Sequence, residues 1–374
     1  MKNEWSAFLK VFAGFFIGLM LLAGGLIFWT NPHRNIPFAS LDRPLMEGNQ
    51  RFIYPSVARD LRFDSAVFGT SSVRFLPPGP LNEEFGGIFA ILGMDAATPY
   101  EQYRLARLFH EVRLRGDLPV RTVIHGIGRS WCEATAEYDK FTGREFPEWM
   151  YDHNPWNDFL YLLNNRVLEV SGRVAAYEAG LRSNTHFDPD GFGDALPPLE
   201  RYDIKAVREL IYGGEVPLPV EPVDPPVDVL PAERASWVFG AHELMPALLA
   251  LSPHRTTVIL MFVPFHEYFL PRPGSHEALV LDECKARIVA MAAARPNTLV
   301  VDFMRSSEIN REDTNYWDPV HYGHETAEVL VRIVARAVRR EGDDSANVTI
   351  LHNGLVRAEI GDKLFLPPKG IGQE

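Results

Sequence analysis

The chain has 374 residues, of which 46% are hydrophobic and 23% are charged, so it can bury a large core. Its formal net charge of -12 argues against nucleic-acid binding, because that function requires a basic stripe. The two cysteines, Cys132 and Cys284, are too few for a disulfide framework or a cysteine-based zinc site. Two buried free thiols are expected, and a single bridge in an oxidising compartment is the alternative.

The first feature along the chain is the uncharged apolar segment 11–30. At about 1.5 Å per residue, a helix of this length matches a hydrocarbon core of about 30 Å. Trp5 and Trp29 flank the segment as interfacial aromatic residues do. The apolar run is longer than that of a cleaved signal peptide, so the sequence predicts an uncleaved transmembrane anchor.

Positive charges on the two sides of this segment nearly balance, so charge alone does not set its orientation. Most signal-anchors keep a short N-terminus in the cytoplasm. On that ground we expect residues 1–10 to be cytoplasmic and everything after residue 30 to lie outside. Residues 31–60 are interpreted as a juxtamembrane linker, and residues 61–340 as one α/β domain.

Strand and helix patterns alternate through this domain. Short apolar runs predict strands at residues 66–68, 87–92, 120–125, 257–263 and 298–303. Helices are predicted at residues 100–115, 157–180, 235–251, 277–294 and 325–340. Residues 182–233, which include a proline run, are interpreted as an irregular insertion with polyproline character. Because parallel strands require crossovers, this order predicts a parallel sheet that helices cover on both faces.

The C-terminal tail, residues 341–374, contains two further apolar runs, 348–352 and 355–360. Asn353-Gly354 separates them, and Asn-Gly between apolar runs is the strongest short signal for a hairpin turn. A β-hairpin is therefore expected after the domain.

The first predicted strand ends at Gly69, and hydroxyl residues follow it, including Ser71. Such a turn places a serine at the C-terminal edge of a parallel sheet, where active sites lie. Gly, Ser and Thr are also common in ordinary turns, so the pattern alone does not establish catalysis. A nucleophilic serine needs a base, and the base needs an acceptor that orients it. Asp318 and His321, between the last strand and the last helix, can supply both at the same edge.

These motifs carry a resemblance to a known family. Gly69-Thr70-Ser71 after the first strand, with Asp318-x-x-His321 before the last helix, resembles the SGNH/GDSL hydrolase superfamily. With the N-terminal anchor, the layout is similar to membrane-anchored SGNH-like proteins of bacterial envelopes, including relatives of alginate O-acetyltransferases. The resemblance spans roughly residues 66–338. It implies a three-layer α/β/α, flavodoxin-like domain with a central parallel sheet of about five strands.

The resemblance makes Ser71 the nucleophile, His321 the general base and Asp318 its orienting acid. The backbone N–H of Ser71 is one expected oxyanion donor, and Gly93 and Gly128 are candidates for the others. No asparagine follows the third strand, where the family's third donor is expected. Arg129, Ser130 or backbone amides are the candidates in its place.

Three further residues, Arg74, Arg129 and His266, are candidate substrate contacts. A surface ion pair for Arg74 and a structural role for His266 are the alternatives. Ser72 is an alternative nucleophile, but the Gly-x-Ser frame favours Ser71. His321-x-x-His324-Glu325 lacks a third ligand at convincing spacing, so neither a metal nor another cofactor is expected.

The resemblance implies acyl transfer through an acyl-serine, with water as acceptor in an esterase or a sugar hydroxyl in an O-acyltransferase. The sequence leaves these two open, because both use the same triad. The expected substrate is an acylated envelope carbohydrate or another small ester, and other envelope-biosynthesis proteins are expected partners. The expected location is the inner (plasma) membrane, with the catalytic domain in the periplasm. The alternative is a non-catalytic envelope protein that keeps the fold and binds a glycan or a partner.

Overall fold

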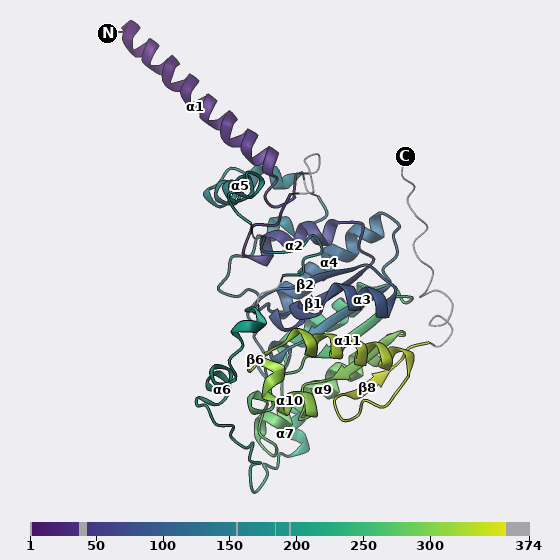
Figure 1. Ribbon diagram of the computed structural model, residues 1–374. Coiled ribbons are helices and arrows are strands. Elements are labelled where there is room, and N and C mark those ends of the chain that lie inside the picture. The colour runs from purple at the N-terminus through teal and green to yellow at the C-terminus, as the bar shows by residue number, and fades with distance from the viewer. Residues whose placement is uncertain (1, 37–42, 155, 184, 194–195, 357–374) are drawn as a thin grey trace.

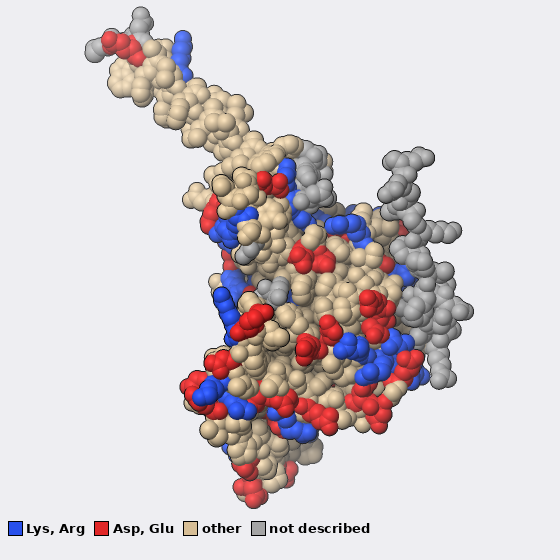
Figure 2. All heavy atoms as spheres, viewed as in Figure 1, with Lys and Arg blue, Asp and Glu red and all other residues tan. Residues whose placement is uncertain are grey.

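A computed structural model describes residues 2–36, 43–154, 156–183, 185–193 and 196–356 of the chain. One long N-terminal helix, α1 (Lys2–Thr30), projects from a mixed α/β domain (Figure 1). Residues 4–30 of this helix are apolar and long enough to cross a membrane, and little of their surface is buried. Charged side chains gather at the free end of the helix, and the rest of its visible surface is uncharged (Figure 2).

The centre of the domain is a six-stranded sheet with the order β2-β1-β3-β4-β5-β8. The first five strands pair in parallel and β8 is antiparallel to β5. The strands are β1 (Ser65–Gly69), β2 (Phe89–Gly93), β3 (Thr122–Ile127), β4 (Thr257–Phe262), β5 (Thr298–Asp302) and β8 (Thr349–Asn353). Nearly all residues of the parallel strands are buried, as in sheets covered on both faces. The five predicted strands are confirmed.

Helices cover both faces of this sheet (Figure 1). The α-helices after α1 are α2 (Gln50–Arg59), α3 (Pro78–Phe85), α4 (Pro99–Arg115), α5 (Asn165–Glu178), α6 (Ile204–Tyr212), α7 (Pro231–Ser236), α8 (Leu244–Ala250), α9 (His276–Ala293), α10 (Glu308–Arg311) and α11 (His324–Arg339). Contacts run from α2 to α4, α8 and α9 in turn, and α3 packs against α11 on the opposite face. The predicted helices at 100–115, 277–294 and 325–340 are confirmed as α4, α9 and α11.

Short 3-10 helices connect these elements. They are η1 (Ser71–Phe75), η2 (Arg129–Trp131), η3 (Glu148–Met150), η4 (Asn157–Tyr161), η5 (Leu199–Arg201), η6 (Gly240–Glu243), η7 (Glu267–Phe269) and η8 (Asp313–Asn315). A small antiparallel pair, β6 (Tyr316–Asp318) and β7 (His321–Tyr322), precedes α11.

The predicted juxtamembrane linker, residues 31–60, is wrong over its second half. Helix α2 lies within this range, and its residues Phe52, Ile53 and Val57 belong to the main hydrophobic core. Arg51 of α2 forms a fully buried ion pair with Glu101 of α4, with 2.6 Å between Nη2 and Oε2. The domain therefore includes α2.

Two predicted helices are interrupted. The 157–180 segment divides into η4 and α5, because the Asn164 side chain accepts a hydrogen bond from the Val167 N–H and starts a new helix. The 235–251 segment divides into α7, η6 and α8, and the Gly240 N–H donates to the Thr135 carbonyl instead of continuing a helix. The insertion at 182–233 is not wholly irregular, because it contains α6, which Asp203 caps.

The expected C-terminal hairpin does not turn at Asn353-Gly354. Strand β8 pairs with β5, and the Gly354 N–H and carbonyl still bond to Thr298 and Asn297. The chain therefore continues along the sheet edge through the Asn-Gly pair. Residues 357–360 of the expected second strand lie outside the described residues.

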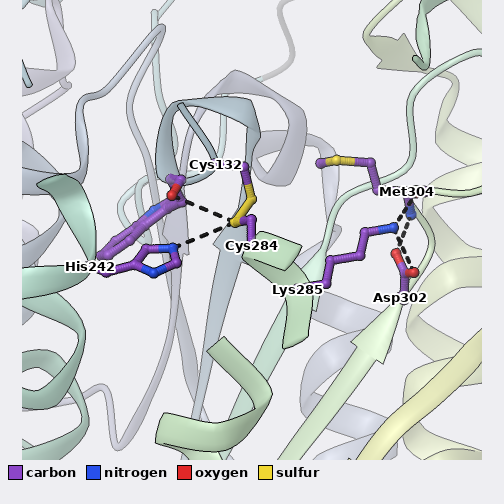
Figure 3. Close-up of a disulfide and its surroundings, with 7 residues drawn as sticks. Cys132, His242, Cys284, Lys285, Asp302 and Met304 are labelled. Carbon is purple, nitrogen blue, oxygen red and sulfur yellow. Dashed lines mark hydrogen bonds and ion pairs between the residues drawn. A yellow bond between two sulfur atoms is a disulfide. The ribbon is translucent and has the colours of Figure 1, made fainter. Parts of the chain in front are cut away.

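Cys132 and Cys284 form a disulfide, so the expectation of two free thiols is wrong (Figure 3). The bond joins the segment after η2 to α9, and the two Cα atoms lie 5.3 Å apart. Next to it, Lys285 of α9 forms an ion pair with Asp302 at the end of β5, with 2.7 Å between Nζ and Oδ2 (Figure 3). Both contacts hold α9 against the carboxyl ends of the strands.

Candidate active site

Ser71 begins η1 directly after β1 ends at Gly69. Gly69 has a φ of +156°, and a Cβ there would lie 2.8 Å from the Val73 side chain. A Cβ at Gly93, at the end of the neighbouring strand β2, would lie 2.7 Å from the Thr70 carbonyl oxygen. Glycine at both positions therefore lets the serine turn pack directly on the ends of β1 and β2.

The structure brings Ser71, His321 and Asp318 together. The Ser71 Oγ lies 2.8 Å from His321 Nε2, and His321 Nδ1 lies 2.6 Å from Asp318 Oδ2. Because Nδ1 faces a carboxylate, it carries the proton of the neutral ring, and Nε2 accepts from the serine hydroxyl. The arrangement is that of a nucleophile, its base and the acceptor that orients the base.

The β6–β7 hairpin fixes the carboxylate of this group. Asp318 Oδ1 accepts hydrogen bonds from the backbone N–H groups of Val320, at 2.8 Å, and His321, at 2.9 Å. Burial raises the pKa of Asp318. The hydrogen bond and charge of His321 and the hydrogen bonds of the two amides lower it by more. The net pKa lies below its ordinary value, so Asp318 remains ionised at neutral pH.

Two neighbours of Ser71 hold the turn against the hairpin. Ser72 is 3% exposed, and its Oγ donates to the Val320 carbonyl at 3.2 Å. The Phe75 ring meets the His321 ring edge-on, with 5.5 Å between centroids. Ser72 therefore connects the turn to the hairpin, whereas the half-buried Ser71 faces the imidazole.

A cavity of about 580 Å³ opens beside the triad, within the size range of small-ligand sites. Its lining combines the triad, apolar side chains and charged groups. The lining residues are Ser71, Arg74, Phe75, Asp95, Ala96, Arg144, Leu196, Pro197, Arg201, Asp203, Ala206, Val207, Leu210, Trp317, Asp318 and His321. Helix α6, from the insertion, supplies one apolar wall, so the insertion belongs to the site.

Arg74 lines this cavity and is 5% exposed. Its guanidinium pairs with Asp95, which also pairs with Arg144, with 3.1 Å between Arg144 Nη1 and Asp95 Oδ2. Burial raises the pKa of Asp95, but Arg74, a hydrogen bond from Gln50 and Arg144 lower it below its ordinary value. Two arginines therefore share one carboxylate at this wall of the cavity.

His266 and Arg129 lie elsewhere. His266 is 2% exposed and is not among the cavity-lining residues; its Nε2 lies 3.1 Å from Asp313 Oδ1, which favours the structural alternative. The Arg129 guanidinium lies over the Phe269 ring, 5.0 Å from its centroid, and lines a separate cavity beside the disulfide. Neither contacts the Ser71 cavity.

The three oxyanion candidates, Ser71, Gly93 and Gly128, differ in their position relative to the cavity. Ser71 is the first residue of η1, so its N–H is among the amides without a partner inside that helix. Gly93 packs on the serine turn, and Gly128 has its Cβ position 3.8 Å from the Thr70 Cγ2. Neither glycine lines the cavity. Of the three candidates, Ser71 is the one that lines the cavity.

Several site residues were not predicted from the sequence. Trp317 adjoins Asp318, and its position in the motif gave a signal that could have indicated it. The capping Asp203 and the apolar spacing of Val207 and Ile211 could have indicated α6. Arg144 comes from a loop, and nothing local in the sequence connects it to Ser71.

A scan against models of known protein families finds no match, and a search of curated proteins finds none either.

Proposed function

We propose that the chain is an SGNH-type serine esterase or O-acyltransferase that works through an acyl-serine. The observation that carries the proposal is the continuous hydrogen-bond chain from Ser71 through His321 to Asp318. A serine hydroxyl is weakly nucleophilic, and a neutral imidazole held by a carboxylate is the group that activates it.

The proposed reaction has two steps, acylation and deacylation of Ser71. The Ser71 Oγ attacks the ester carbonyl while its proton passes to His321 Nε2, and the Ser71 N–H donates to the developing oxyanion. The imidazolium returns that proton to the leaving alcohol and an acyl-serine remains. A water or sugar hydroxyl then attacks the acyl carbonyl while its proton passes to His321, which returns the proton to the Ser71 Oγ as the acid or the new ester leaves.

Two features support the SGNH assignment. The parallel strands follow the order 2-1-3-4-5, which is the flavodoxin-like order. The serine follows the first of these strands, and the aspartate and histidine precede the last helix. An aromatic residue at the cavity, Trp317, is compatible with a carbohydrate substrate, because sugar rings pack on aromatic faces.

Two observations support an extracytoplasmic, membrane-anchored location. The Cys132–Cys284 disulfide fits an oxidising compartment. Ile27 of α1 is 2% exposed and packs against Leu162 and Val167 of the domain, so removing α1 would uncover an apolar contact.

Labelling with a fluorophosphonate tests the nucleophile. The wild-type chain is expected to be labelled, and Ser71→Ala is expected to abolish labelling and turnover of p-nitrophenyl acetate. Ser72→Ala weakens the contact with Val320 but keeps the Ser71 hydroxyl, so labelling should persist. Labelling that survives Ser71→Ala, or is absent from the wild-type chain, contradicts the proposal. Transfer of acetyl groups to an added oligosaccharide, rather than release of acetate alone, separates transferase from esterase.

The second candidate function is non-catalytic binding of a glycan or partner. The observation that favours it is the position of Gly93 and Gly128 outside the cavity, which leaves the Ser71 amide as the one assigned oxyanion donor. Glycan binding that is unchanged in Ser71→Ala, together with no turnover by the wild-type chain, supports this alternative.

A further inference from the structure

The end of α1, the membrane anchor of the proposed function, packs directly on the domain. Its last turns pack on the η4–α5 segment, where Ile27 shares one buried apolar cluster with Leu162, Val167 and Ile36. Thr30 is also fully buried, and its hydroxyl donates to the Leu26 carbonyl at 2.8 Å. The end of α1 is therefore fixed against the segment that contains η4 and α5 (Figure 1).

Arg43 adds polar interactions to this contact. Its Nε donates to the Trp29 carbonyl at 3.2 Å, and its guanidinium lies 5.0 Å from the centre of the Trp29 ring. The same guanidinium pairs with Glu178 near the end of α5, at 3.1 Å between Nη1 and Oε2. One arginine thus joins the aromatic end of the apolar helix to α5. Tryptophan is enriched at the membrane–water interface, and Arg43 places the Trp29 end of α1 beside α5.

Large apolar side chains are exposed on the η4–α5 segment. The exposed fractions are 60% for Trp156, 46% for Tyr161, 57% for Leu163, 37% for Leu168 and 83% for Leu181. Single exposed apolar residues are normal, but here five occur within one segment beside the end of α1, and we call these five residues the η4–α5 patch. Trp and Tyr are the residues enriched at the membrane–water interface.

We propose that this η4–α5 patch lies in the surface of the bilayer that α1 spans, as a second, interfacial contact of the domain. The arginines of α5 do not supply a free positive face, because Arg166 pairs with Glu47 and Arg173 with Glu169. Burial of apolar surface therefore drives the contact, and zwitterionic lipid is sufficient for it. Contact at α1 and at the patch restrains rotation of the domain about α1.

Site-specific fluorescence on the full chain tests the proposal. The chain's two cysteines are bridged, so one introduced cysteine is the reactive thiol. Leu163→Cys and Leu181→Cys place an environment-sensitive fluorophore on the patch, and each replaces an exposed side chain. Leu230→Cys is the matched control, because Leu230 is 71% exposed and adjoins α7, at the opposite end of the domain (Figure 1).

Each labelled chain is placed in phosphatidylcholine nanodiscs with or without lipid that carries a nitroxide near its headgroup. We expect several-fold stronger quenching at positions 163 and 181 than at 230. Equal quenching at all three positions overturns the proposal. Shielding of positions 163 and 181 from iodide without quenching by nitroxide lipid also overturns it, because protein would then cover the patch. Nanodiscs expose both membrane faces, so the result is independent of topology and of Ser71 chemistry.

Discussion

Asp318 sets the orientation and the tautomer of His321, on which the proposed chemistry depends. It accepts from His321 Nδ1 and from two backbone amides, so both its ionisation and its position are fixed. Its carboxylate selects the tautomer in which His321 Nε2 is free to accept the Ser71 proton. The serine and histidine are separated by 250 positions, and this selection makes their contact productive.

We predict that Asp318→Asn lowers kcat on p-nitrophenyl acetate by about 10³- to 10⁴-fold, with little change in KM. The asparagine amide can donate toward Nδ1 and so favours the wrong tautomer. Stopped-time assays and thermal unfolding of the purified variant measure activity and folding together. Near-wild-type kcat in a folded Asp318→Asn variant would show that the carboxylate is not part of the catalytic group.

Helix α6 lines the cavity and also bonds to the segment that leads into the β6–β7 hairpin. The carboxylate of Asp313, three positions before β6, accepts from Tyr212 Oη and Arg208 Nε of α6, each at 2.7 Å. Its Oδ1 also lies 3.1 Å from His266 Nε2. This one buried side chain therefore holds the apolar cavity wall against the segment that continues into Asp318.

Burial raises the pKa of Asp313, but hydrogen bonds from Tyr212 and Arg208 and the contact with His266 lower it below its ordinary value. A carboxyl whose pKa is depressed on folding contributes stability above its unfolded pKa, and that stability is lost as pH falls through the folded pKa. The stability contributed by the Asp313 contacts is therefore fully present at neutral pH and is lost as the pH falls below about 4.

We predict that Asp313→Asn lowers the free energy of unfolding by about 1–3 kcal/mol at pH 7 and raises KM more than it lowers kcat. The triad stays intact while the α6 wall loosens. Urea unfolding at pH 7 and pH 3 measures the pH dependence, and the difference from wild type should shrink at the lower pH. A constant difference at both pH values, or a lower kcat with unchanged KM, contradicts a role in positioning α6.

The sequence predicted those elements whose signals are local. Strands such as β4 are continuous apolar runs, and α4 has helical periodicity with a capping box at Thr98. The Ser71–His321–Asp318 contact could also be predicted from the sequence, because both motifs lie at the same edge of the sheet. Contacts between distant segments that carry no such motif could not be predicted, and the disulfide between Cys132 and Cys284, 152 positions apart, is an example. Nothing in either local sequence indicates that η2 and α9 meet.

At the scale of the whole molecule, α1 and the domain form one packed unit. Fully burying an isoleucine contributes about 1.5–3 kcal/mol, and Ile27 is 2% exposed against α5 and its flanking residues. Arg43 joins Trp29 to Glu178. Loss of the whole of α1 would expose Leu162 and Val167 and remove Trp29 from Arg43, so the fold favours retention of the end of α1.

We predict that α1 remains attached in the mature chain. A chain with an epitope tag at each end should run as one full-mass species that carries both tags and resists extraction from membranes by alkaline carbonate. Introduction of a charged residue, Leu19→Arg, should weaken this retention, because a charge at the centre of a membrane helix costs about 2.5–3.5 kcal/mol on insertion scales. The matched change Lys10→Arg, at the edge of the apolar segment, keeps the charge and should leave retention unchanged. A mature species that has lost the N-terminal tag and begins near Gly25 would show that the segment is a cleaved signal.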